Sequence, residues 1–194
     1  MTVGILALQG DVAEHRRALR ACGVEAVDVR SASELDAVGA LVIPGGESTT
    51  MLKLIDRYDL RSGLIKRIEA GMPVLATCAG AIVLATHVSD GEPPLGVLDL
   101  SVIRNAYGSQ RESFETEVTV DGVGTMAVAF IRAPVFEDPG PGVDVLARWE
   151  GRPVAVRAGS ILAVAFHSEI TGSAALHRYF LESVMSNGAR VGGE

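Results

Sequence analysis

The sequence contains 194 residues, a length that suits one large domain. Hydrophobic residues make up 48% of it and charged residues 21%, so the composition supports a packed core and excludes a disordered chain. The formal net charge of −7 argues against nucleic acid as the main partner, because phosphate binding needs an excess of lysine and arginine.

The first half of the chain alternates apolar runs with amphipathic segments. Continuous aliphatic runs predict buried strands at 3–8, 24–29, 40–46 and 73–80. Helical spacing of apolar residues predicts helices at 11–23, 32–38 (with Ser33 as a cap), 49–60, 62–71 and 81–88. This alternation implies an α/β fold with a mostly parallel central sheet and helices on both faces.

The pattern changes from about residue 96, where strand-like runs dominate. Glycine and proline turns separate these runs, which lie at 96–108, 113–120, 125–135, 143–149, 152–159 and 161–166. We expect them to add antiparallel strands to the α/β core, before an amphipathic helix at 173–186. We see no linker long enough to divide the chain, so a single domain spanning residues 1–194 is predicted.

The chain is expected to work in the reducing cytoplasm. Its two cysteines, Cys22 and Cys78, are too few for a disulfide scaffold. The stretch MTVGILALQG has no cationic leader before its apolar residues, and no apolar run reaches the roughly 18 residues of a membrane span. In such a setting a conspicuous cysteine is more often reactive than structural.

Cys78 stands where an apolar strand meets a turn of small residues and then a helix, which is the layout of a nucleophile elbow. The small neighbours Ala76, Ala79 and Gly80 let the backbones pack closely. Backbone N–H groups at the start of the helix favour a thiolate and can stabilise an oxyanion. The alternative is a buried, inert cysteine between a strand and a helix.

His167 and Glu169 end the apolar run AVAFHSEI, and side chains two apart in a strand point to the same side. A thiol nucleophile needs a base, and an imidazole base needs a group that orients it. Together with Cys78, these two residues would complete a catalytic set. A solvated strand end before a helix is the alternative.

The stretch PGGEST at 44–49 places two glycines after a predicted parallel strand, where ligands bind in open α/β sheets. Gly46 could donate an N–H to an oxyanion, while Glu47 and Ser48 could hold polar groups of a substrate. The alternative is an ordinary turn in which Ser48 or Thr49 caps the next helix.

Two arginines follow apolar runs, Arg104 in RNAYGSQ and Arg132 in FIRAP. Each can pair bidentately with a carboxylate, or can simply lie over apolar neighbours at the surface. The remaining histidines, His15, His87 and His177, fall within or near predicted helices, where we expect solvated or packing roles. Their spacing to the cysteines does not match a metal site.

Taken together, the motifs resemble one enzyme family. GILALQGDVAEH, PGGESTTM, TCAG, RNAYGSQ, SFE, FIRAP and AFHSEITG occur in this order between residues 4 and 172. They are similar to those of the glutaminase subunits of pyridoxal 5′-phosphate synthase, a branch of the class I (triad) glutamine amidotransferases. The resemblance implies the single-domain, three-layer fold of that class.

The resemblance also implies residue roles. Cys78 would attack the side-chain amide of glutamine, His167 would act as base and then acid, and Glu169 would orient it. The backbone N–H groups of Gly46 and Ala79 would form the oxyanion hole. The positions that match glutamine contacts in the family are Gly46, Glu47, Ser48, Arg104, Ile131 and Arg132.

For partners, the resemblance implies a synthase subunit with a (β/α)₈ barrel fold, to which ammonia passes inside a large hetero-oligomer. No metal and no cofactor are implied for this chain, since the vitamin is the product of the partner. Two other functions stay open. One is a triad glutaminase that serves another synthase, such as that of the histidine pathway, and the other is a catalytically silent regulatory subunit.

Two positions depart from the family's usual sequence. Ala76 replaces the first glycine of GTCAG, which is tolerable unless that residue needs a positive φ angle. Ser168 replaces the proline of His-Pro-Glu. A proline at this position would bias the backbone of His167 towards an extended conformation, and serine lacks this effect. We expect an active enzyme, because the three chemical groups of the triad are present.

Overall fold

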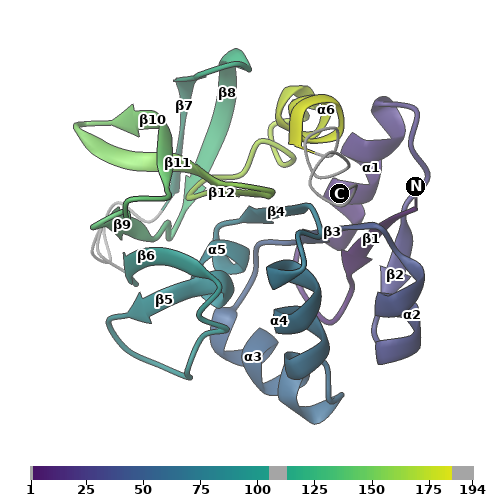
Figure 1. Cartoon of the computed structure of the whole chain (residues 1–194). Helices are drawn as coiled ribbons and strands as arrows, with labels where there is room; N and C mark the ends of the chain where they lie inside the picture. Colours follow the sequence, from purple (N-terminus) through teal and green to yellow (C-terminus); the bar gives the residue numbers. More distant parts are fainter. Residues whose placement is uncertain (1, 105–112, 185–194) are drawn as a thin grey trace.

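A computed structural model of the chain describes residues 2–104 and 113–184 (Figure 1). Its central sheet has seven strands in the order β10-β11-β12-β4-β3-β1-β2. The strands that run parallel are β1 (Val3–Leu6), β2 (Val27–Val29), β3 (Ala40–Ile43), β4 (Val74–Thr77) and β12 (Ile161–Val164). At one end, β11 (Arg152–Ala158) and β10 (Asp144–Trp149) continue the sheet in antiparallel pairing.

Helices cover both faces of the central sheet (Figure 1). One face carries α1 (Val12–Ala21), α6 (Ala175–Tyr179) and the π-helical turn η1 (Phe180–Val184). The other face carries α3 (Ser48–Arg57), α4 (Arg61–Glu69) and α5 (Ala79–Leu84), with α2 (Ala32–Ala37) beside α4. Four of the parallel strands are buried at every residue, as strands covered on both faces must be.

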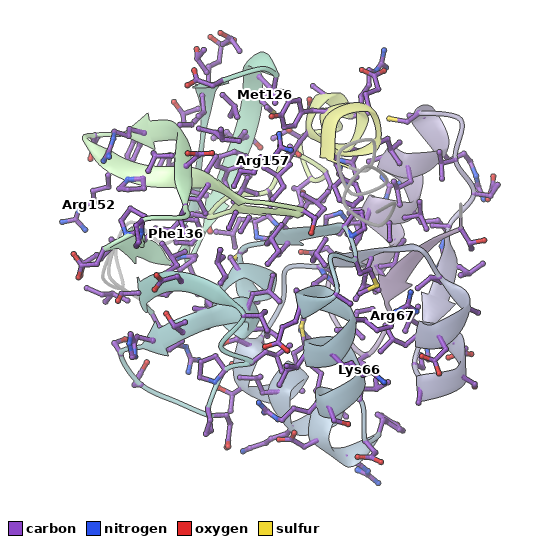
Figure 2. All side chains as sticks on the ribbon, in the orientation of Figure 1. Lys66, Arg67, Met126, Phe136, Arg152 and Arg157 are labelled. Carbon is purple, nitrogen blue, oxygen red and sulfur yellow. The ribbon has the colours of Figure 1, made fainter. Side chains whose placement is uncertain are left out.

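Side chains also join the helices to one another. In Figure 2, Arg67 extends from α4, and its guanidinium donates hydrogen bonds to the carbonyl oxygens of Leu35 and Val38 at the end of α2. These bonds satisfy carbonyl groups that a helix leaves unpaired at its C-terminus. Among the described residues, none of the helices is long and apolar enough to cross a membrane.

Two smaller sheets lie beside the central sheet. One contains β5 (Ala85–Val88), β6 (Leu98–Ile103) and β9 (Val135–Glu137), and the other is the hairpin of β7 (Ser113–Val120) and β8 (Gly124–Ile131). The ring of Phe130 on β8 lies 5.3 Å from that of Trp149 on β10 and 5.8 Å from that of Phe166. This aromatic contact fixes the hairpin over the end of β12, next to His167.

Two segments differ in structure from the sequence-based prediction, 81–88 and 161–166. The predicted helix at 81–88 ends at Leu84, and Ala85–Val88 form β5, which pairs in parallel with β6. Thr86 and Val88 are β-branched and favour a strand once a partner strand is present. The run at 161–166 is also no antiparallel addition, since β12 lies inside the central sheet, parallel to β4.

The predicted cap of α2 is wrong, and so is the alternative cap that was considered for α3. Ser31, not Ser33, accepts the hydrogen bond from the Glu34 N–H that caps α2. Glu47, not Ser48 or Thr49, caps α3, because its longer side chain reaches two N–H groups of the first turn. The predicted helix at 173–186 is divided into α6 and η1. Residues 105–110 of RNAYGSQ and 185–186 lie outside the described residues.

Candidate active site

The site lies at the carboxyl ends of three neighbouring parallel strands. Gly46 follows β3, Cys78 follows β4, and His167 follows β12. These strands are adjacent in the order β12-β4-β3. Loops that leave adjacent parallel strands emerge at the same edge of the sheet, so the fold brings together three segments that are up to 121 residues apart (167 − 46).

Cys78 occupies a sharp turn between β4 and α5. Its backbone has φ 47° and ψ −105°, a conformation that residues with a side chain rarely adopt. The residue is 6% exposed, and its Sγ lies 3.9 Å from the carbonyl oxygen of Ile131. A side chain on Gly80 would overlap the carbonyl oxygen of Ile43, so only glycine fits there. Ala76 has no positive φ, and its methyl group is therefore tolerated.

His167 connects the cysteine to two carboxylates. Its Nδ1 lies 2.7 Å from Oε1 of Glu169 and 3.3 Å from Oδ2 of Asp11. Its backbone pairs with Ala129 on β8, through hydrogen bonds of 2.8 and 2.9 Å. Burial lowers the pKa of His167, but hydrogen bonds with Asp11, Cys78 and Glu169 outweigh burial and raise the pKa well above its usual range. The imidazole therefore carries a proton that it could donate to a leaving group.

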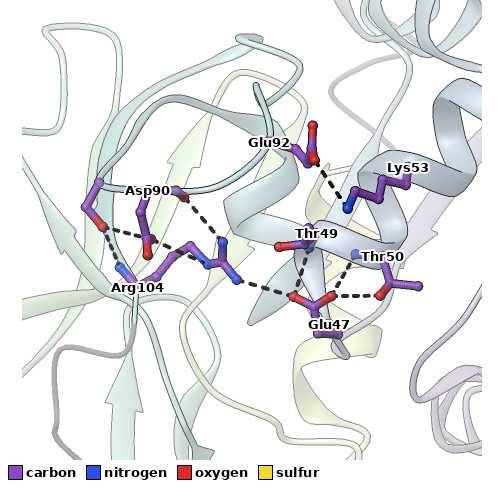
Figure 3. Close-up of polar contacts among 8 residues, drawn as sticks. Glu47, Thr49, Thr50, Lys53, Asp90, Glu92 and Arg104 are labelled. Carbon is purple, nitrogen blue, oxygen red and sulfur yellow. Dashed lines mark hydrogen bonds and ion pairs between the residues drawn. The ribbon is translucent and has the colours of Figure 1, made fainter.

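Glu47 and Arg104 form a polar subsite at the start of α3 (Figure 3). Glu47 accepts hydrogen bonds from the N–H groups of Thr49 and Thr50, and Arg104 donates to the same carboxylate over 3.3 Å. Arg104 is also held by the carbonyl oxygen of Asp90 at 3.3 Å. Burial raises the pKa of Glu47, but the hydrogen bonds from Thr50 and Thr49 lower it to about 2. Glu47 is therefore ionised at neutral pH.

These residues surround one cavity of about 200 Å³. Its lining consists of Asp11, Gly46, Glu47, Ser48, Cys78, Ile82, Arg104, Ile131, Arg132, Pro134, His167 and Ile170. All ten residues singled out from the sequence lie in or beside it. Only Glu169 and Ala79 are outside the lining: Glu169 hydrogen-bonds to Nδ1 of His167, and Ala79 begins α5. The cavity therefore joins the predicted nucleophile to the predicted polar contacts.

Asp11 was missed by the sequence analysis. It follows β1, whose carboxyl end meets the same edge of the sheet, and its N–H donates to the carbonyl oxygen of Gly45 over 3.2 Å. Gly10 has a φ of 95°, and a side chain there would overlap that same oxygen. A glycine followed by a carboxylate in the loop after a parallel strand was the signal that could have identified Asp11.

The structure places the three remaining histidines. His15 and His177 have packing roles and not solvated ones, because both are fully buried and their ring nitrogens lie 2.9 Å apart. His87 lies on strand β5 rather than near a helix end.

Among the described residues, Asp11, His167 and Glu169 place possible metal ligands within 4.8 Å of one another. The hydrogen bonds of His167 to both carboxylates account for this spacing.

Comparison with known proteins identifies the family. The sequence profile of the SNO glutamine amidotransferase family matches residues 5–186. The chain belongs to this family. It is 53% identical over 189 residues to a Parafrankia protein named pyridoxal 5′-phosphate synthase subunit PdxT, covering 95% of this chain and 93% of that protein. A Thermus thermophilus protein of the same name is 51% identical over 93% of this chain and 96% of the relative.

Solved structures support the same assignment. A crystal structure of a glutamine amidotransferase is 49% identical to this member of the SNO family, with a TM-score of 0.91 over 96% of this chain and 100% of that one. A Thermoplasma acidophilum structure described as a GMP synthase protein is 20% identical with a TM-score of 0.68, covers 100% of this chain and 98% of that one, and shows the fold alone.

The family, the class I glutamine amidotransferase fold and the enzyme class predicted from the sequence are thereby confirmed. The predicted function, glutamine hydrolysis for pyridoxal 5′-phosphate synthesis, is confirmed at the level of the family and its named relatives. The roles of single residues and the extent of the domain, residues 1–194, stay predictions.

Proposed function

We propose that this SNO family member hydrolyses L-glutamine to L-glutamate and ammonia with a triad of Cys78, His167 and Glu169. The ammonia would pass to a synthase subunit with a (β/α)₈ barrel fold, within a large hetero-oligomer that makes pyridoxal 5′-phosphate. The observation that carries this proposal is the hydrogen-bonded His167 and Glu169 beside a cysteine in a strained turn. Both cysteines are free thiols, which fits the reducing cytoplasm.

The reaction would begin with attack of the Cys78 thiolate on the carbonyl carbon of the glutamine side chain. The negative charge on the oxygen would be stabilised by the N–H groups of Gly46 and Ala79. His167 would then donate its proton to the leaving nitrogen, so that the C–N bond breaks and ammonia leaves a γ-glutamyl thioester. Glu169 would hold the imidazole in one orientation throughout.

The thioester would be hydrolysed by water with the same groups. Neutral His167 would accept a proton from the water molecule as its oxygen attacks the thioester carbon. The C–S bond would break, which releases glutamate and restores the thiolate beside the imidazolium. The sum of both steps is glutamine plus water giving glutamate plus ammonia, with the enzyme unchanged.

Glutamine would be held by Gly46, Glu47, Ser48, Arg104, Ile131 and Arg132. The α-ammonium group of the substrate would pair with Glu47, which is ionised at neutral pH. The α-carboxylate would pair with a guanidinium, and both arginines line the cavity. Because these charges lie apart from the thiol, they would select an amino acid and direct its side chain towards Cys78.

The deciding experiment measures glutamate release from glutamine in the presence of the synthase subunit. We expect activity for the wild-type chain, complete loss for Cys78→Ala, and an unchanged rate for the matched control Cys22→Ala. A Cys78→Ala variant that retains the wild-type rate would overturn the mechanism. Recovery of the chain from cells with only an unrelated acceptor subunit would overturn the proposed partner.

A further inference from the structure

A buried polar cluster lies directly behind the triad, and of its four members only Glu169 has a part in the reaction as proposed above. It consists of His15 on α1, Thr77 at the end of β4, Glu169, and His177 on α6. His15, Thr77 and His177 are 0% exposed, and Glu169 is 4% exposed. Buried polar groups destabilise a fold unless they are hydrogen-bonded, so the contacts within this cluster need an explanation.

The four side chains form a continuous chain of contacts that ends on the triad. Nε2 of His177 lies 2.9 Å from Nδ1 of His15. Nε2 of His15 lies 3.0 Å from the hydroxyl of Thr77 and 3.6 Å from Oε1 of Glu169. That same Oε1 accepts the hydrogen bond from Nδ1 of His167, at 2.7 Å. One oxygen of Glu169 therefore faces both imidazoles.

Both histidines behind Glu169 are neutral at pH 7. Burial, together with the charges of His177 and His167, lowers the pKa of His15 well below its usual value. Burial lowers the pKa of His177 to about 4. A neutral imidazole has one N–H and one acceptor nitrogen, so each ring must donate on one side and accept on the other.

Two directions of donation are possible along this chain. If His15 donated from Nδ1, then His177 would carry its hydrogen on Nδ1, which has no partner among the described residues. The lone pair of His15 Nε2 would then face the carboxylate. If His177 donates from Nε2, the unpaired atom is only an acceptor, and the N–H of His15 points to Thr77 and Glu169. The second direction avoids both a buried unpaired N–H and a repulsive contact.

We propose that His15 is a positioning residue of the triad: its ring is oriented by His177, and its Nε2–H bonds to Thr77 and faces the Glu169 carboxylate 3.6 Å away, which favours one position of that carboxylate. Through Glu169 it fixes the tautomer and the ring plane of His167. His15 also hydrogen-bonds to Thr77, the residue before Cys78, so one side chain aligns the cysteine turn and the carboxylate. This proposal rests on the proposed function, because it assigns a role to groups behind the same triad.

The activity test compares His15→Leu, His15→Gln and the control His87→Gln, with the synthase subunit present. Removal of a group that orients a metal-bound histidine costs about 10- to 100-fold, and we expect the same range for a group behind a catalytic histidine. We therefore expect His15→Leu to lower kcat for glutamine hydrolysis by that factor, with KM within about twofold of wild type, because His15 does not line the cavity. The side-chain amide of His15→Gln can replace the Nε2–H donor and should recover most of kcat.

A second measurement does not depend on activity or on the folding of a variant. Nitrogen-15 NMR of the labelled histidine rings distinguishes protonated from unprotonated ring nitrogens in the full wild-type chain. We expect His15 and His177 to be neutral at pH 7, each with its hydrogen on Nε2. A hydrogen on Nδ1 of His15, or a His15→Leu variant with wild-type kcat, would overturn the proposal. An inactive wild-type complex would instead contradict the proposed function.

Discussion

The strained turn at Cys78 makes a prediction about stability that can be tested separately from activity. A non-glycine residue with φ 47° and ψ −105° costs on the order of 1–3 kcal/mol, while glycine adopts this conformation freely. Glycine also gives the unfolded chain more freedom, which costs about 0.5–1 kcal/mol. Cys78→Gly should therefore be more stable than Cys78→Ala by about 1 kcal/mol, with both variants lacking the thiol.

The assay is urea-induced unfolding of the two variants and the wild-type chain, which gives the free energy of unfolding of each. In a thermal unfolding experiment, a difference of about 1 kcal/mol would appear as a shift of about 2–4 °C in the melting temperature of a domain of this size. The control is Ala13→Gly, at an exposed position of α1 where the backbone has no positive φ. There glycine should be less stable than alanine by up to about 1 kcal/mol.

The comparison therefore predicts opposite signs at the two positions. Glycine should stabilise the chain at residue 78 relative to alanine, and destabilise it at residue 13. If Cys78→Gly were less stable than Cys78→Ala by as much as the Ala13→Gly change costs, the turn would store no strain. The interpretation of Cys78 as an elbow held in place by the surrounding fold would then be refuted.

Three further predictions concern the site and its surroundings. Ser168→Pro should keep or raise glutaminase activity, because the buried Ser168 hydroxyl has no partner among the described residues and its loss breaks no hydrogen bond. A large loss of activity relative to Ser168→Ala would show that the site has adapted to serine. Arg104→Leu should raise KM for glutamine by about 10- to 100-fold, since a charged hydrogen bond contributes about 1.5–3 kcal/mol, and an unchanged KM in steady-state kinetics would contradict this. The folded chain disfavours protonation of His177, whose pKa falls from 6.5 to about 4, so stability should be lost as the pH drops from 6.5 towards 4. The loss is about 3 kcal/mol (2.5 pH units at about 1.4 kcal/mol each), and His177→Phe should flatten this dependence in urea unfolding at pH 7 and 4.5.

The sequence predicted the parallel strands at 40–43 and 74–77 because both aliphatic runs are buried on both faces of the sheet. The run at 161–164 is buried in the same way, but the strand-like runs that precede it led to its assignment to the antiparallel addition. The site could be predicted from the residues that follow these strands, since their carboxyl ends share one edge. The strand Ala85–Val88 could not be predicted in this way. Ala85 and Val88 continue the helical spacing of the apolar residues of α5, and only pairing with β6 decides between helix and strand.

The buried histidines could not be predicted for a related reason. His15 lies in DVAEHRRALRA, where charged neighbours suggest a solvated helix face. It is buried because α6, more than 150 residues later, covers it with His177. Single-sequence patterns report which face of a helix is apolar, but they do not report which polar side chain finds a partner across the fold. Asp11 was missed because its contact with His167 crosses from β1 to β12.

The most direct test of the central claim is the identity of the residue that carries the γ-glutamyl group during turnover. The complex with the synthase subunit would be mixed with glutamine, quenched in acid, digested and analysed by mass spectrometry. We predict one glutamyl group on the peptide that contains Cys78, and none on the peptide that contains Cys22. Glutamate release without any adduct on Cys78, or an adduct on another residue, would contradict the account.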